Sequence, residues 1–374
     1  MRFHRVNRVY EIKDTGEKSE LYFELCEKLP HVTLNPGFIC PKDTKSGSWY
    51  NDPFIEIVTV NPDIVAPPIA VKRARSSLGT LIEAICAAIA AAWDPAKTKV
   101  VFHSSGLDSR VISSCIRKLN QERGDEWLGN ILFLSNRWES KPFTKIMKAQ
   151  GWKPSQYAAY TDGGPDMHFD RVLDFERYWY TNNAPVPMLG RFFGYLPEWA
   201  QEKGLLPGND QLIFFNGHGP AFGGNNREGM WKTSGGSVHV TSRIQHFKRH
   251  DYYSPSMLNY PSNSHGIFVL AEANVVNRAL GHSSKGSIRQ AIERALSPET
   301  LRIPRRPGND HRGKPVARSV MLRSEACFNE SIYAKLTGKR WKTPSNAAIS
   351  KAWAEWGVAS LCEHLVGSGV DVRL

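Results

Sequence analysis

The hydrophobic pattern in the middle of the chain alternates between two periods. Consecutive apolar positions, typical of strands buried on both faces, occur at residues 100–102, 131–134, 157–160 and 211–215. Between these runs, apolar residues recur at helical spacing. The expected helices cover residues 76–93, 109–119, 141–150 and 192–203. Strands that alternate with helices in this way predict an α/β fold, in which a parallel sheet is flanked by helices.

The two ends of the chain have different patterns. Short strand patterns separated by Gly, Pro, Asp and Asn indicate a small β-rich N-terminal region, with strands at 9–12, 21–23 and 55–60. Residues 265–374 are expected to be mostly helical, apart from a loop rich in basic residues. The expected divisions are residues 1–72, a central domain over 73–310, and a mostly helical C-terminal extension over 311–374 that packs on the central domain.

The first candidate site follows the strand at 100–102. Residues 104–109 read Ser-Ser-Gly-Leu-Asp-Ser, just before an expected helix. A strand, a turn of small residues and a helix start direct several backbone N–H groups toward one point, where they and the helix dipole favour phosphate. A carboxylate there repels phosphate unless a divalent cation lies between them, so Asp108 indicates Mg²⁺. An ordinary strand–turn–helix connection uses the same residue types.

A second loop rich in glycine follows the strand at 211–215. Residues 216–225 read Asn-Gly-His-Gly-Pro-Ala-Phe-Gly-Gly-Asn. Glycines in this number indicate that the backbone approaches a ligand or another segment closely. In parallel sheets, ligands bind beyond the carboxyl ends of the strands, which is where the loop at 104–109 is expected.

Together these segments resemble the synthetase domain of the asparagine synthetase family, in the ATP pyrophosphatase (PP-loop) superfamily. Residues 104–109 are similar to the superfamily's Ser-Gly-Gly-x-Asp-Ser loop, with Ser105 in place of the first glycine, where its Cβ narrows the room for pyrophosphate. Gly217, His218 and Gly219 match the family's later loop, but the Asp-Glu pair of that loop is missing. The motif is not a Walker A loop, because no Gly-Lys-Ser/Thr follows.

A third segment resembles the family's Lys-x-x-x-Arg-x-Ala helix and the Arg-Pro-Lys turn after it. Lys285, Arg289 and Ala291 match the helix, and Arg305 or Arg306 stands where the turn has its lysine. An arginine neutralises phosphate but does not give up its proton as a lysine can. The resemblance covers residues 76–310. It does not include the family's glutaminase domain, whose catalytic cysteine at position 2 is replaced here by Arg2.

The resemblance implies an adenine nucleotide alpha hydrolase-like fold and an ATP-dependent synthetase, or ligase, that forms AMP and pyrophosphate. Such an enzyme adenylates a carboxylate or carbonyl, which an amine or ammonia then attacks. The implied cofactors are ATP and Mg²⁺, with Asp108 as the metal ligand. The implied nucleotide-binding residues are Ser104, Ser105, Gly106, Asp108, Ser109, Gly217, His218 and Gly219. The implied catalytic donors to the leaving pyrophosphate are Lys285, Arg305 and Arg306.

The charge distribution leaves the acceptor open. The chain has a net charge of +12, and residues 302–342 hold eleven Lys/Arg against three acids. Such a region attracts polyanions, although most charged segments are solvated surface. The acceptor is therefore either a small molecule or free nucleotide, or a base in tRNA or DNA bound by this region. The missing acids favour a third hypothesis, a non-catalytic nucleotide-binding or structural protein. The oligomeric state is left open.

Cysteine usage and hydropathy indicate the compartment. The six cysteines are scattered, without a Cys-x-x-Cys pair, as expected of reduced thiols: Cys26, Cys40, Cys86, Cys115, Cys327 and Cys362. No apolar run is long enough to cross a bilayer, and residues 1–5 lack the apolar core of a signal peptide. With 41% hydrophobic and 22% charged residues, the chain is expected to be a cytoplasmic globular protein without a membrane partner.

Overall fold

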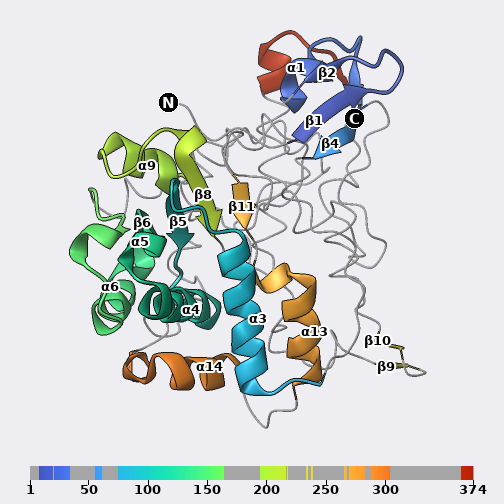
Figure 1. Cartoon of the computed structure of the whole chain (residues 1–374). Helices are drawn as coiled ribbons and strands as arrows, with labels where there is room; N and C mark the ends of the chain where they lie inside the picture. The colour runs from blue at the N-terminus through green and yellow to red at the C-terminus, as the bar shows by residue number, and fades with distance from the viewer. Residues whose placement is uncertain are drawn as a thin grey trace, which may run out of the picture.

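Five parallel strands form the sheet at the centre of the chain (Figure 1). In this computed structural model of the protein, the strand order is β11-β8-β5-β6-β7, and each neighbouring pair is parallel. The strands are β5 (Thr98–Phe102), β6 (Ile131–Ser135), β7 (Tyr157–Ala159), β8 (Leu212–Phe215) and β11 (His265–Ile267). In the register, Val100 lies opposite Leu132 on one side and Phe214 on the other. The predicted parallel sheet flanked by helices is confirmed.

The structure describes the parts of the chain that carry this sheet and its helices, together with segments near both ends. The described residues are 8–19, 21–33, 55–60, 75–163, 194–215, 217, 233–234, 237–238, 265–267, 269–282, 288–303 and 364–373. The expected domain boundaries, between residues 72 and 73 and between 310 and 311, lie outside them.

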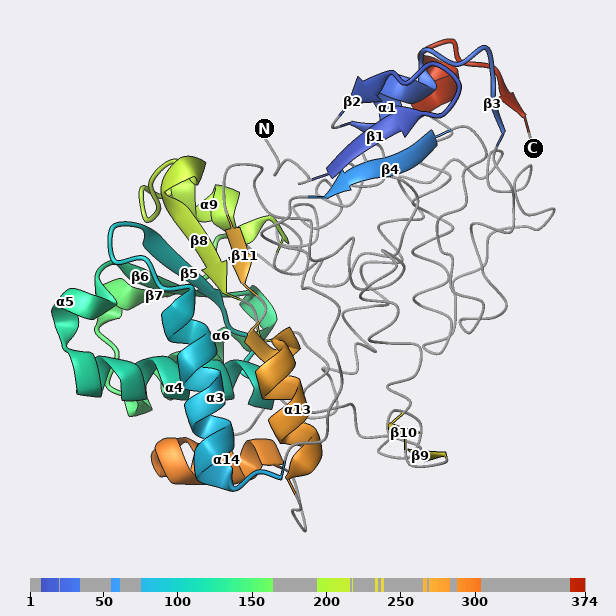
Figure 2. The same ribbon diagram turned by 45° about the vertical axis from the view of Figure 1, so that its right-hand side comes forward.

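Helices lie on both faces of the sheet (Figures 1 and 2). The α-helices of this part are α3 (Leu78–Ala91), α4 (Leu107–Arg123), α5 (Asp125–Leu128), α6 (Ser140–Ala149), α9 (Leu196–Glu202), α13 (Ala273–Gly281) and α14 (Ile288–Leu296). Short 3₁₀ turns occur at η1 (Arg137–Glu139), η2 (Pro154–Gln156), η3 (Asn209–Gln211), η4 (Val269–Ala271) and η5 (Pro298–Thr300). In both views, α3, α4, α13 and α14 lie on one side of the strands and α9 on the other.

Alternate strand residues contribute to different sides of the sheet. Val101, Phe133 and Phe215 belong to one large apolar cluster with α3, α4, α6, α13 and α14. Their neighbours Val100 and Phe214 are also fully buried but lie outside that cluster. Because successive side chains of a strand point to opposite faces, both faces are covered, which explains the continuous apolar runs in the sequence.

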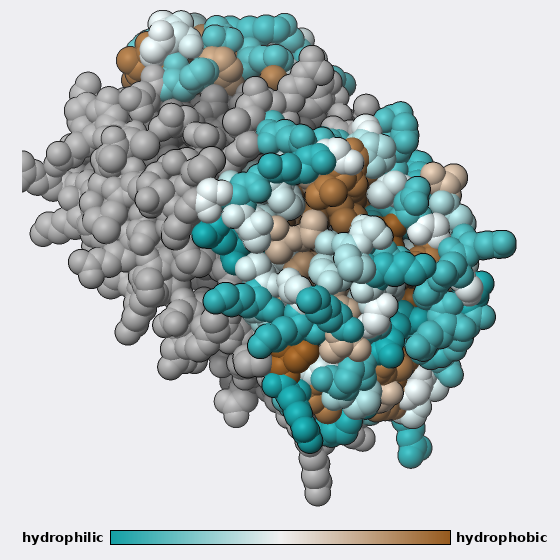
Figure 3. Space-filling model, turned by 90° about the vertical axis from the view of Figure 1, so that its left-hand side faces the viewer, coloured by the Kyte–Doolittle hydropathy of each residue, from teal (hydrophilic) through white to brown (hydrophobic). Residues whose placement is uncertain are grey.

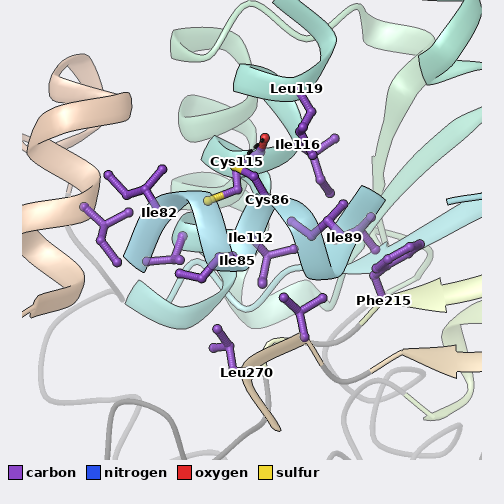
Figure 4. Close-up of a cluster of buried hydrophobic side chains, with 14 of the residues drawn as sticks. Ile82, Ile85, Cys86, Ile89, Ile112, Cys115, Ile116, Leu119, Phe215 and Leu270 are labelled. Carbon is purple, nitrogen blue, oxygen red and sulfur yellow. Dashed lines mark hydrogen bonds between the residues drawn. The ribbon is translucent and has the colours of Figure 1, made fainter. Parts of the chain in front are cut away.

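The packing of α3 against α4 forms much of the large cluster (Figure 4). The helix α3 begins at Leu78 because the Ser77 hydroxyl accepts a hydrogen bond from the Thr80 N–H (3.2 Å), while the Thr80 hydroxyl accepts one from the Ser77 N–H (3.0 Å). Across the helix pair, the Cys86 thiol lies 4.0 Å from the carbonyl oxygen of Cys115 (Figure 4). This contact fixes α3 beside the helix that follows the first candidate loop.

A separate group of short elements contains both ends of the described chain. An antiparallel sheet has the order β2-β1-β4, and a parallel pair joins β3 to β12. The bounds are β1 (Arg8–Ile12), β2 (Lys18–Ser19), α1 (Tyr22–Cys26), β3 (Val32–Thr33), β4 (Ile55–Val60) and β12 (Val372–Arg373). The C-terminal segment lies beside α1 and β2 in Figure 1. A further hairpin pairs β9 (Thr233–Ser234) with β10 (Ser237–Val238).

Several sequence-based predictions need correction. The strand predicted at 21–23 is wrong, because this turn of chain forms α1 and buries Leu25 and Cys26 completely; that burial outweighs the β preference of the aromatic residues before them. The stretch from 265 was expected to be mostly helical; its described residues are so in α13 and α14, but they also include the short strands β11 and β12, which were not expected. Most of the C-terminal extension, expected to pack on the central domain, lies outside the described residues. Its described part, residues 364–373, contacts the N-terminal region: Val32 N–H donates to Asp371 O (2.8 Å), and the rings of Phe23 and His364 meet at 4.2 Å.

On the face shown in Figure 3, most of the described surface is hydrophilic, with apolar areas between the hydrophilic residues. Within the described residues, the helices are too short or too polar to cross a membrane.

Candidate functional site

The candidate site lies where the order of the strands reverses. From β5 the chain moves to β6 and β7 on one side of the sheet, and later to β8 and β11 on the other. The carboxyl ends of β5 and β8 are therefore neighbours, and the connections that leave them diverge. In open parallel sheets, ligands bind at such a switch point.

The connection from β5 to α4 is the segment singled out in the sequence. The Ser104 N–H donates to the Ser109 hydroxyl (3.0 Å), and the two hydroxyl oxygens also lie 3.0 Å apart. Gly106 precedes α4 without a side-chain cap on the first turn, and a Cβ built there would lie 3.1 Å from Ser104 Oγ. The turn is therefore tight, and the first-turn N–H groups of α4 depend on another partner.

Ser105 has a backbone conformation that favours glycine. Its φ is +49°, and the residue is fully buried. Its N–H donates to His103 Nδ1 (3.1 Å), and its carbonyl oxygen accepts from Arg110 Nε (3.0 Å). A left-handed backbone at this place favours glycine and costs free energy for a residue with a Cβ, such as this serine. Ser104, Gly106 and Asp108 stay partly exposed, so these residues are placed to meet a ligand.

His103 contacts the turn from its buried side and is a neutral imidazole. Burial, and then the positive charge of Arg110, lower the pKa of His103 to about 3. Because Nδ1 accepts from Ser105, the proton of the neutral ring sits on Nε2, which faces the Ser113 hydroxyl at 3.4 Å. The imidazole therefore acts as a structural hydrogen-bond partner of the loop.

The loop after β8 approaches the start of α4 closely. A Cβ built on Gly217 would lie 3.2 Å from the carbonyl carbon of Asp108 and 3.2 Å from the Ser109 nitrogen. A side chain at this position would push the two backbones apart by a few tenths of an ångström, so glycine fits this approach best. The two loops selected in the sequence, more than a hundred positions apart, thus meet at one point.

Asp108 carries the charge at this point. Its carboxylate is in the first turn of α4, with 41% of the side chain exposed. Arg289 Nη1, from the first turn of α14, donates to both carboxylate oxygens at 3.0 Å. The third sequence segment is therefore brought to the same place through its arginine.

Arg110 joins the loop to the segment after α14. Its side chain is 1% exposed, and Nη1 contacts Glu293 Oε1 at 2.7 Å, also 1% exposed. The same guanidinium donates to the carbonyl oxygens of Ser105, Thr300 and Ile303, each at 3.0 Å. The Thr300 hydroxyl adds a hydrogen bond to Glu293 Oε1 (2.7 Å). One buried ion pair thus holds the turn, α14 and the end of η5 together.

The structure brings together part of the expected site. Placed at the switch point are Ser104, Ser105, Gly106, Asp108, Ser109 and Gly217. Outside the described residues lie His218, Gly219, Lys285, Arg305 and Arg306, as does nearly all of the basic region at 302–342. Sequence reasoning did not select His103, Arg110 or Arg289 as site residues. Only Arg289 had a signal, as the arginine of the Lys-x-x-x-Arg-x-Ala segment.

The donor set suits a metal ion that arrives with phosphate. Within the described ranges, no cluster of three His, Cys, Asp or Glu side chains could hold a metal ion alone. Mg²⁺ is commonly bound by one or two carboxylates together with substrate phosphates and water. Asp108, exposed beside the tight turn, fits this pattern. Comparisons with known proteins add no identity, because no family model and no curated protein matches the chain.

Proposed function

We propose that the protein is an ATP-dependent synthetase of the PP-loop type, which forms AMP and pyrophosphate. The observation that carries this proposal is the meeting of one tight turn, one carboxylate and a glycine from the neighbouring strand's loop at the switch point of a parallel sheet. Gly217 lies close to the backbone of Asp108 and Ser109, and Ser105 has the left-handed conformation of a glycine position. The resemblance of residues 104–109 to the superfamily's pyrophosphate loop supports the same function.

The proposal assigns a role to each described residue of the candidate site. The N–H groups that begin α4, with the Ser104 hydroxyl and the backbone of Gly106, bind the β- and γ-phosphates. Asp108 would hold Mg²⁺, and the metal would supply charge neutralisation to the leaving pyrophosphate. His103 and Arg110 stabilise the conformation of the turn through their hydrogen bonds with the backbone of Ser105. The acceptor is a carboxylate or carbonyl, which the adenylate activates for an amine or ammonia.

The identity of the nucleotide that the protein forms from ATP tests the proposal. The full-length protein is incubated with ATP labelled at the α-phosphate, Mg²⁺ and a mixture of amino acids as carboxylates and amines, and the nucleotide products are separated. AMP and pyrophosphate are expected. Formation of ADP and phosphate instead would contradict cleavage between the α- and β-phosphates.

A matched pair of variants connects the product to the site. Asp108→Asn is expected to abolish AMP formation, since it removes the metal ligand. Asp125→Asn is the control, because Asp125 begins α5 and pairs with Lys153 on the surface. Equal loss in both variants, or full activity of Asp108→Asn, would count against the site.

A further inference from the structure

The contact between Arg289 and Asp108 joins opposite charges inside the proposed phosphate site. Nη1 lies 3.0 Å from both carboxylate oxygens. The side chains are 20% and 41% exposed, so the pair is partly screened by water rather than locked in the core. A partly exposed pair of this kind exchanges partners more readily than the buried pair of Arg110 and Glu293.

Arg289 is better suited to phosphate than to a permanent structural role. A guanidinium has five N–H donors in a planar fork, and the contact with Asp108 uses one of its three nitrogens. The neighbouring ion pair on the same helix is different in kind, because Glu293 is buried with Arg110 and Thr300 and has fixed partners. Arg289 therefore lies partly exposed in the first turn of α14, directly beside the turn that the phosphates would contact.

We propose that Arg289 is a phosphate-binding residue that exchanges Asp108 for the triphosphate, which frees Asp108 for the divalent cation. This inference rests on the proposed function. Electrostatics supports the exchange: a cation bound to Asp108 repels a guanidinium on the same carboxylate, whereas the triphosphate attracts it. Arg289 thus supplies positive charge to the phosphates from α14, independently of the basic region at 302–342.

If Arg289 exchanges partners, Asp108→Asn should change the ATP affinity in opposite directions without and with Mg²⁺. The affinity is measured by calorimetry on the whole chain. Without metal, in EDTA, Asp108→Asn is expected to bind ATP more tightly than wild type, because a repelling charge is lost and Arg289 is released. With Mg²⁺, the same variant is expected to bind more weakly. Arg289→Met is expected to lose at least about tenfold in affinity for ATP in EDTA, the loss typical of a charged hydrogen-bond donor.

The control is Arg294→Met, an exposed arginine on the same helix. Its ATP affinity should equal that of wild type in both conditions, and thermal melts of all variants verify folding. Unchanged affinity of Arg289→Met, or weaker metal-free binding by Asp108→Asn, would overturn the exchange while leaving the proposed function intact. A wild-type protein that binds ATP neither with nor without Mg²⁺ would overturn both.

Discussion

Replacing Glu293 with methionine is expected to destabilise the protein strongly. The variant keeps the length of the side chain but removes the only negative charge within hydrogen-bond distance of Arg110 among the described residues. Both side chains are 1% exposed, so the buried guanidinium would lose the carboxylate that faces it at 2.7 Å. Breaking such a pair costs about 3–5 kcal/mol. The Thr300 hydroxyl does not add to this loss, because the carbonyl oxygen of Ser297 at 2.8 Å remains as its acceptor.

The assay is urea unfolding of the full-length protein, followed by tryptophan fluorescence. Glu299→Met is the matched control, since Glu299 pairs with Arg117 and both side chains are about a third exposed. An exposed pair contributes about 0.2–1 kcal/mol. A loss in Glu293→Met no larger than in Glu299→Met would refute the reasoning.

A second variant separates charge from hydrogen bonding. Arg110→Met removes the buried charge together with donors to the carbonyl oxygens of Ser105, Thr300 and Ile303. The double variant Arg110→Met/Glu293→Met buries neither charge of the pair, so it should be less unstable than the sum of the two single losses. Additive losses would show that the two charges do not interact.

Three further predictions concern the loops. Ser105→Gly should be more stable than Ser105→Ala by about 1 kcal/mol in urea, since both lack the hydroxyl and only glycine relieves a φ of +49°; equal stability would contradict strain at this residue. Gly217→Ala should lower the free energy of unfolding by about 1–3 kcal/mol and weaken ATP binding, because the new Cβ would lie 3.2 Å from backbone atoms. The control is Gly79→Ala on α3, which should not destabilise the protein, since the nearest atom to its Cβ lies at 3.7 Å. Stability should fall as the pH drops from 6.5 toward 3, because unfolding lets His103, whose native pKa is about 3, take up a proton. His103→Asn should reduce the slope of stability against pH by about 1.4 kcal/mol per pH unit. Parallel pH profiles of the variant and the wild type would disprove the assignment.

The sheet was predictable because its strands are buried on both faces. Their apolar runs stand out in the sequence, and β5, β6 and β8 lie within a few residues of their expected places. The short edge strand β11 was missed, since three residues containing a histidine and a glycine form no such run. Residues 21–23 were assigned to a strand from local preference, which the burial of Leu25 and Cys26 overrides.

The site was predictable only as far as local geometry determines it. Small residues beside Asp108 indicated a tight turn, and the glycines after β8 indicated a close approach, which Gly217 makes. The contacts of Arg110 and Arg289 join residues far apart in the sequence, on helices whose packing no local pattern specifies. A buried arginine directly after the loop looks, in the sequence, like an ordinary polar residue of a helix.

The pairing of β3 with β12 affects the order in which the protein is completed during synthesis. Val32 and Thr33 leave the ribosome early, but their partners Val372 and Arg373 are translated after everything else described. The parallel sheet from β5 to β11 can form before β12 is made, whereas the N-terminal elements acquire this strand only after residues 372–373 have been translated. Removing the last few residues is therefore expected to expose apolar side chains, such as Val32, at the opposite end of the sequence.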